Sequence, residues 1–253
     1  MNSGLDWQVI FGPEGRHLLA TGLWVTIQLS FYSIVFSTVV GLLIAMGRVS
    51  QSAVLTPLRA VLAAITEIFR NIPLLVHLAF WNFGIFGFAW VQAAVHPATS
   101  LYSLQFLASI CALVTYRCSY VAEVFRSGLQ SIPKGQMEAA RATGLSYGKT
   151  MRRVVLPQVA RIVIPPLGNQ YVGVTKNTSV VLVIGVKDLV FQAYQIESVT
   201  FQVFLAFGSV MVIFSAVCLL ESAALNWCAR WMDRKWGGAI RPAGKKQVSA
   251  VTA

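Results

Sequence analysis

Long runs of residues without a charged side chain dominate the chain. The first extends from His17 to Gly47, the second from Asn71 to Tyr116, and another from Ser198 to Leu220. A helix needs only about 20 consecutive apolar residues to cross the hydrocarbon core of a membrane, so each run is long enough for a span. The second run is too long for one span, and the turn-forming sequence His96–Ser100 divides it. The pattern predicts several membrane-spanning helices.

We expect five spans and an all-α integral membrane fold, with the membrane domain at residues 18–230. The spans are predicted at residues 18–46, 54–83, 103–125, 157–186 and 201–229. The second and fourth spans each contain a basic residue at depth and internal proline, Pro73 in one and Pro165 with Pro166 in the other. Prolines inside a span are tolerated where neighbouring helices or a cavity satisfy the freed backbone groups. These two spans are therefore expected to have irregular backbone.

The composition agrees with a membrane protein. Only 11% of the 253 residues are charged, 56% are hydrophobic, and the mean hydropathy is +0.66. An ordinary soluble domain has roughly 25% charged residues, and an intrinsically disordered chain has far fewer apolar ones. The net charge of +11 can indicate a nucleic-acid partner, but in a membrane protein it more often reflects basic cytoplasmic loops. We therefore expect no nucleic-acid partner.

The distribution of Lys and Arg predicts the orientation of the chain. Fifteen of the 20 lie on one side of the predicted spans, at Arg48, at Arg59 and in the segments 126–161 and 230–246. The opposite side has only Arg16 and Lys187. Because basic residues are retained in the cytoplasm, residues 1–17 are expected outside, and residues 231–253 are expected to form a basic cytoplasmic tail near the lipid surface.

No arrangement of residues in the sequence indicates covalent or metal chemistry. The cysteines lie in apolar stretches without metal-type spacing, and the histidines are scattered. The sequence from Gly144 to Thr150 resembles a phosphate-binding loop, but three residues separate its glycines where that motif has four. We expect a chain that is not an enzyme, with no metal and no cofactor of its own.

The longest segment on the basic side, residues 126–156, predicts two short helices joined by a bend. Ser131–Pro133 has the character of a helix start, with serine as the cap, and Gly144 is expected to stop or bend that helix. Ser146 can cap a second short helix, and Pro157 opens the next span. Such a loop, lying across the membrane surface, is suited to docking in a groove on another protein.

The same loop contains a motif that can be compared with known families. Glu138, Ala139 and Ala140 are followed after three residues by Gly144 and after nine more by Val154, Leu156 and Pro157, and the motif is preceded by Gly135 and Gln136. It resembles the EAA loop of type I ABC importer permeases, which usually have isoleucine where Val154 stands. Flanking sequences narrow the resemblance to permeases of polar amino-acid importers: Phe69–Val76, Glu123–Leu129, Pro166–Asn169 and Lys176–Ser179. The resemblance covers about residues 20 to 230.

The resemblance implies a type I permease fold in the cytoplasmic (inner) membrane of a bacterium. Two permease subunits, identical or homologous, would form the pathway, and ABC ATPase subunits that bind ATP and magnesium would dock on their loops. A solute-binding protein would deliver the amino acid. The stretch from Arg70 to Trp81 looks most like the glutamate/aspartate and general amino-acid branches. A channel-like or structural membrane subunit without ATP coupling is the alternative, and such a subunit has no need of the loop.

Charged residues within the predicted spans are candidates for function, because each costs about 2.5–3.5 kcal/mol on insertion scales. Glu67 and Arg70 stand three residues apart and can pair on one helix face, and Glu123 and Arg126 repeat this spacing. Structural ion pairs between helices are the alternative to a functional role for these four. Glu221 is expected to pair with a basic residue, Arg117, or to extend toward the membrane surface.

Lys176 is the strongest candidate for contact with a solute, because no carboxylate neighbours it in the sequence. A zwitterionic amino acid needs a cation for its carboxylate and acceptors for its ammonium group. The residues expected to serve the carboxylate are Lys176, Asn177, Thr178 and Ser179, and those expected to serve the ammonium group are Asn169 and Glu67. Arg70 completes the candidate pathway. The alternative for Lys176 is a bridge to the second permease subunit.

Overall fold

The computed structural model describes residues 6–49, 53–95 and 103–236, and these residues are almost entirely helical. The predicted turn at His96–Ser100 and the tail beyond Trp236 lie outside the described residues. The elements are α1 (Gln8–Phe11), α2 (Pro13–Val49), η1 (Ala53–Leu55), α3 (Thr56–Asn71), α4 (Leu74–Ala79), η2 (Phe80–Ile85), α5 (Ala89–Val95), α6 (Leu104–Gln130), α7 (Lys134–Ala142), α8 (Tyr147–Thr150), η3 (Met151–Val155), α9 (Leu156–Asn177), η4 (Thr178–Ile184), α10 (Leu189–Thr200) and α11 (Val203–Trp236).

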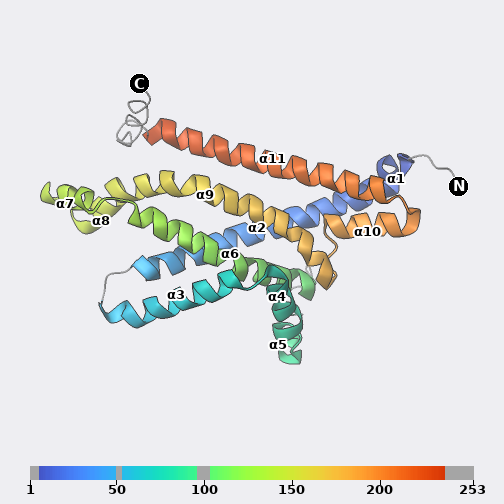
Figure 1. The fold of residues 1–253 in the computed structure, drawn as a ribbon, viewed down its shortest axis with the longest axis horizontal. Helices are drawn as coiled ribbons and strands as arrows, with labels where there is room; N and C mark the ends of the chain where they lie inside the picture. Colours follow the sequence, from blue (N-terminus) through green and yellow to red (C-terminus); the bar gives the residue numbers. More distant parts are fainter. Residues whose placement is uncertain (1–5, 50–52, 96–102, 237–253) are drawn as a thin grey trace, which may run out of the picture.

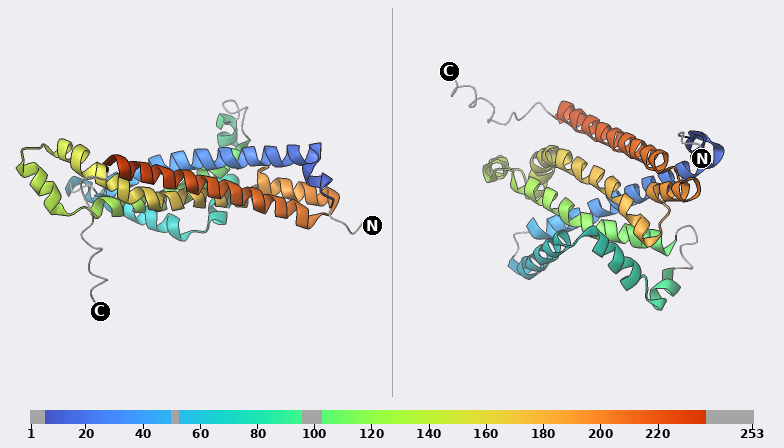
Figure 2. Two further views of the ribbon diagram at one scale, coloured as in Figure 1. Left: turned by 90° about the horizontal axis from the view of Figure 1, so that it is seen from above. Right: turned by 45° about the vertical axis from the view of Figure 1, so that its right-hand side comes forward.

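The helices form an elongated bundle around α6. Helix α2 packs along α6, α3 lies on one side of α6, and α9 lies on the other side with α11 on its outer face (Figure 1). Helices α7 and α8 project from one end of the bundle, whereas α1, α10 and the start of α11 lie at the opposite end (Figures 1 and 2). The long loop is therefore separated from α10 by the length of the bundle.

Three helices are each long and apolar enough to cross a membrane: Pro13–Val49, Leu104–Gln130 and the Val203–Met232 part of α11. Two further spans arise from bent helix pairs, which gives five spans when each pair counts as one. This agrees with the predicted number. The second span is irregular, as its internal proline predicts, because α3 and the α4–η2 segment meet at an angle of 105°. The break falls at Pro73, whose nitrogen cannot donate a helical hydrogen bond.

The fourth span is less disrupted than its two prolines suggest. The helical backbone continues from Tyr147 to Ile184, and Pro165 and Pro166 lie inside α9. It ends at Gly185, whose φ of 84° is in the left-handed region that favours glycine. Helix α10 then departs at 50°. The sequence analysis missed α10, although Asp188 supplies a cap signal: its Oδ1 accepts a hydrogen bond from the Phe191 backbone nitrogen at 2.9 Å.

Small residues on α2 allow it to approach α6 closely. Ser37, Gly41 and Ala45 are all buried along this contact. A methyl group at Gly41 would lie 2.9 Å from the Cys118 carbonyl oxygen and 2.7 Å from a methyl group of Val121. Small residues four positions apart permit such approaches between helices in membranes. The backbones of α2 and α6 therefore lie close together at Gly41.

Candidate functional site

The predicted docking loop has the expected helix–bend–helix form. Helix α7 ends at Ala142, Gly144 has a φ of 84°, and α8 begins at Tyr147. The Gly144 nitrogen donates to the Arg141 carbonyl oxygen at 3.0 Å, which closes the end of α7. The expected cap differs: Pro133, not Ser131, occupies the N-cap position of α7, and the Ser131 hydroxyl donates to the Gly128 carbonyl oxygen at 2.8 Å.

One side of the loop is anchored to the bundle and the other is free. Met137 and Met151 pack against an apolar cluster that includes Val155 and Val159 at the start of the fourth span. The opposite side of α7 and the bend are exposed, and this surface contains Glu138 and Ala139 with Gly144. A partner can therefore reach the bend without displacing the apolar contacts that fix the loop.

The other residues of the motif frame this exposed surface. Gly135 is exposed, and Gln136 and Ala140 are half-buried on α7. Val154 and Pro157 are half-buried where η3 joins α9, and Leu156 is 47% exposed between them. The segment Met151–Val155 is a π-helical turn. The second short helix thus continues into the fourth span without a break.

The sequence that resembles a phosphate-binding loop has a different structure here. Gly148 and Lys149 lie inside α8, and the Thr150 side chain is buried. A phosphate-binding loop follows a buried strand and leaves its backbone nitrogens free, whereas the described residues contain no strand. The geometry gives no cradle for phosphate at this position.

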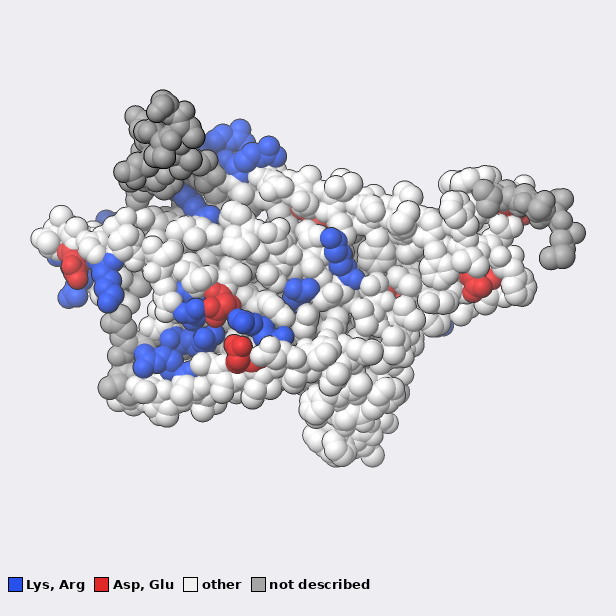
Figure 3. Space-filling model, in the orientation of Figure 1, with Lys and Arg blue, Asp and Glu red and all other residues white. Residues whose placement is uncertain are grey.

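An ion-pair cluster joins α2 to α6 near the loop end. Glu123 binds Arg126 on its own helix, as the spacing predicts, and also pairs with Arg48 of α2 at 3.1 Å. Figure 3 shows that Lys and Arg gather on the half of the molecule that ends in α7 and α8. The cluster holds two cations with one carboxylate, and the three side chains are only 17–31% exposed.

Replacing the central carboxylate of this cluster should destabilise the protein. Glu123→Gln leaves Arg48 and Arg126 without a countercharge, and we expect a loss of about 1–2 kcal/mol, less than a fully buried pair would lose. Thermal unfolding of the purified protein in detergent measures this as a lower Tm. Glu67→Gln is the matched control, because the Glu67 side chain is 62% exposed and its pair is longer at 3.8 Å. Equal Tm values for both variants would contradict the prediction.

Glu67 and Arg70 form the predicted pair at the end of α3. Their side chains are 3.8 Å apart, and the Asn71 side-chain nitrogen donates to the Glu67 carboxylate at 3.3 Å. Both residues lie immediately before the break at Pro73. The Arg70 side chain is 33% exposed, so this pair remains accessible to a small polar solute.

The remaining pathway candidates lie on α9 and η4. Asn169 and Lys176 are exposed on the same side of α9, and no carboxylate among the described residues pairs with Lys176. Asn177 is half-buried. Thr178 is 0% exposed, and its hydroxyl donates to the Thr175 carbonyl oxygen at 2.8 Å. A solute in this chain could therefore reach Lys176 but not the Thr178 side chain.

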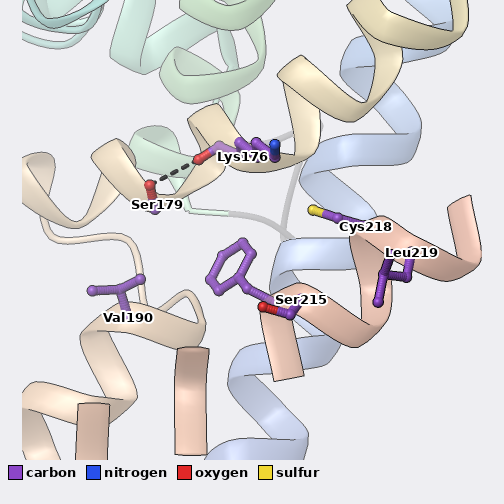
Figure 4. Close-up of a pocket in the computed structure, with 7 residues that line it drawn as sticks. Lys176, Ser179, Val190, Ser215, Cys218 and Leu219 are labelled. Carbon is purple, nitrogen blue, oxygen red and sulfur yellow. Dashed lines mark hydrogen bonds between the residues drawn. The ribbon is translucent and has the colours of Figure 1, made fainter. Parts of the chain in front are cut away.

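Lys176 borders an open groove of about 580 Å³ between α9, η4, α10 and α11. Phe214 lines the groove, and Figure 4 shows the other lining residues, which are Lys176, Ser179, Val190, Ser215, Cys218 and Leu219. The Ser179 hydroxyl donates to the Lys176 carbonyl oxygen at 2.8 Å. The groove combines one cation with a largely apolar wall.

The structure does not bring the two groups of candidates into contact within one chain. Glu67 and Arg70 lie on α3, Asn169 and Lys176 lie on α9, and α6 packs between these two helices. A continuous polar route between the two groups within this chain would therefore pass along the α6 surface that faces α9.

Arg117 lies on α6, within the predicted third span, and its contacts come largely from other parts of the fold. Its guanidinium donates to the Gln170 side-chain oxygen at 2.9 Å and lies over the rings of Tyr116 and Tyr120, at 5.3 and 5.6 Å from their centroids. Stacking on aromatic faces is favourable for arginine when it is desolvated. Gly173 makes room for it, since a methyl group there would lie 2.9 Å from Nη2.

Of the two alternatives for Glu221, the pair with Arg117 does not form. It lies beside Thr175 at the contact between α9 and α11. The tyrosines at positions 116 and 120 stand one helical turn apart on either side of Arg117, and this spacing was the available signal for an arginine held by rings. Gln170 and Gly173 are more than 50 residues away in the sequence, so their contribution requires the fold.

Comparison with known proteins decides the family. Residues 37–237 match the family of binding-protein-dependent transport system inner membrane components. The chain belongs to this family. It is 34% identical to the probable glutamine ABC transporter permease of Bacillus subtilis, over 85% of this chain and 93% of that protein. It is 31% identical to the histidine/lysine/arginine/ornithine transport permease of Salmonella typhimurium, over 91% of this chain and 94% of that one.

A solved structure supports the same conclusion. The crystal structure of an amino acid ABC transporter with histidines contains a chain with 31% identity and a TM-score of 0.75, covering 91% of this chain and 99% of that chain. The present protein is therefore a multi-pass permease subunit of a type I amino-acid ABC importer, which is a transport component and not an enzyme. The channel-like alternative is not favoured.

Proposed function

We propose that this permease couples amino-acid import to a separate ABC ATPase through the loop Gly135–Pro157. The exposed side of α7 and the left-handed turn at Gly144 support this proposal. Small side chains on that side permit close approach of a partner, and the continuous helix from Tyr147 into α9 provides a path for the resulting movement. The chain itself has no ATP site in this proposal, and ATP with magnesium binds to the partner ATPase.

The assembly that we propose contains a second permease subunit, two ATPase subunits and a solute-binding protein in a bacterial inner membrane. Its test is affinity purification of the tagged full-length chain from detergent-solubilised membranes of a cell that makes the complete transporter. We expect the ATPase to elute with the permease. Elution of the permease without any ATPase, under conditions that preserve a known importer of this type, would contradict the proposal.

The orientation proposed for this chain places the loop end in the cytoplasm. The gathering of Lys and Arg toward α7 and α8 supports it (Figure 3). A reporter that is active only in the cytoplasm should be active when fused after Trp236 and inactive when inserted at Thr99. A reporter that is active only outside should give the reverse pattern. Cytoplasmic activity at Thr99 and external activity after Trp236 would show that the orientation is the opposite of the one proposed.

The pathway that we propose follows the polar residues of α3, α6 and α9. It includes Glu67, Arg70, Asn169, Lys176, Asn177 and Ser179 from the sequence, and Arg117 from the structure. Thr178 contributes to the pathway only through the backbone turn that it stabilises, because its side chain is buried.

Glutamate or aspartate is the cargo that we propose within the polar amino acids. Three exposed or half-buried cations (Arg70, Arg117 and Lys176) accompany one carboxylate, Glu67, along the proposed pathway. This excess of positive charge favours an anionic amino acid. Uptake of radiolabelled glutamate by cells with the complete transporter should be competed by aspartate and not by lysine. The reverse competition would assign a cationic cargo.

A further inference from the structure

The break in the second span leaves two backbone carbonyls without helical partners. In a continuous helix the carbonyl oxygens of Phe69 and Arg70 would accept from the nitrogens of residues 73 and 74. Pro73 has no N–H, and the chain turns by 105° before Leu74 begins the next helix. A carbonyl left unpaired inside a membrane is costly, so these two oxygens need other donors.

Two side chains occupy the positions of the missing donors. The Nε2 atom of His77, on α4, lies 3.3 Å from the Phe69 carbonyl oxygen. The Tyr120 hydroxyl, on α6, donates to the Arg70 carbonyl oxygen at 3.1 Å. Because a carbonyl oxygen can only accept, Nε2 must carry a hydrogen. The end of α3 is thus joined to α4 by His77 and to α6 by Tyr120.

A ring cluster and a hydroxyl hold His77 in place. His77 is 4% exposed, and its Nδ1 lies 3.3 Å from the Thr115 hydroxyl oxygen. The Trp81 indole nitrogen donates to the same oxygen at 3.0 Å. The His77 ring packs edge-on against Phe69 and Tyr116, with centroids at 5.6 and 5.7 Å. These contacts connect α3, α4 and α6, which meet at the bend in Figure 1.

Tyr120 connects the bend to both arginines of the proposed pathway. Its hydroxyl fixes the backbone of Arg70, and its ring lies under the guanidinium of Arg117. It also packs against Tyr116 with a centroid distance of 5.4 Å. Tyr120 therefore links the backbone of one cation to the guanidinium of the other.

We infer that His77 and Tyr120 are positioning residues for transport: they pin the broken second span to α6 and thereby set the place of the Glu67–Arg70 pair relative to Arg117. The inference rests on the proposed role of that pair in the pathway. In this arrangement α3, the bend and α6 move as one unit during the transport cycle, and the break at Pro73 is a fixed corner and not a hinge.

The experiment measures the corner and the transport separately. Spin labels at Val61 of α3 and Phe80 of η2, both exposed, report the bend by pulsed electron paramagnetic resonance on the complete transporter, in a background whose four native cysteines are replaced by alanine. We expect one narrow distance distribution. His77→Leu and Tyr120→Phe should broaden it and lower uptake per assembled transporter by about tenfold, the effect of losing one hydrogen bond to a freed carbonyl.

His77→Gln is the matched rescue variant, because its amide nitrogen can donate to the Phe69 carbonyl oxygen while its size stays close to that of histidine. It should restore both the narrow distribution and most of the uptake. A narrow distribution in all variants overturns the inference, as does a broad distribution with undiminished uptake. Failure of the unaltered transporter to take up amino acid contradicts the proposed function instead, and the distance measurement still decides whether these residues fix the corner.

Discussion

Gly144→Val is expected to abolish ATPase association and amino-acid uptake together, while insertion of the protein into the membrane is unchanged. Gly144 has a φ of 84°, and a methyl group at this position meets nothing within 4 Å in the chain. The effect therefore comes from the backbone: a left-handed conformation costs an L-residue about 1–2 kcal/mol, and a β-branched residue is a stronger outlier. The turn at Gly144 should therefore change conformation, and the exposed side of α7 should no longer fit its partner. ATPase retained on washed membranes measures the association.

Two variants separate the turn from the mere addition of bulk. Gly148→Ala adds a methyl group in equally open space on a helix of the same loop, with no positive φ, and should retain the ATPase. Gly144→Asn should retain more than Gly144→Val, because asparagine tolerates the left-handed region. Wild-type ATPase retention and uptake in Gly144→Val would show that this turn is not part of the docking element.

Lys176→Ala is expected to reduce uptake by about 10- to 100-fold with little change in assembly. The range corresponds to the loss of one charge-assisted hydrogen bond to a solute carboxylate. Lys176 is exposed and has no carboxylate partner among the described residues, so its removal breaks no ion pair in this part of the chain. Uptake is measured per assembled transporter, with the amount determined by co-purified ATPase.

Lys176→Arg is the matched control, because it keeps the positive charge at the edge of the groove. It should retain much more uptake than the alanine variant. Loss of assembly in Lys176→Ala would instead assign the lysine to a bridge with the second permease subunit. Equal uptake in the wild type and in both variants would remove it from the pathway.

The spans were predictable because hydropathy is local. An apolar run such as His17–Gly47 is enough by itself to predict a membrane span, and α2 contains the whole run. The bend at Pro73 was only half predictable: the proline marks a break, but its 105° angle depends on α6, which supplies Tyr120 to one of the freed carbonyls. Helix α10 was harder to predict, because it is short and the cap at Asp188 is its only strong local signal.

The candidate site likewise has a part that the local sequence predicts and a part that only the fold shows. The docking loop is contiguous in sequence, so its turn at Gly144 could be anticipated from one glycine between two short helical segments. The contacts of Arg117 could not be anticipated, because Gln170 and Gly173 come from another span. Glu221, the partner considered from the sequence, lies beside Thr175 instead. A charged residue in a span indicates that a partner exists, and only the fold identifies it.

The central claim is that this permease couples ATP hydrolysis to import, and one measurement tests it most directly. The complete transporter is reconstituted in proteoliposomes with ATP and magnesium on the side of the docking loop and a loaded solute-binding protein on the other. The loaded binding protein should raise ATP hydrolysis, and labelled amino acid should accumulate above its external concentration. Equilibration of the amino acid without accumulation, at a rate independent of ATP, would contradict the account and indicate a channel.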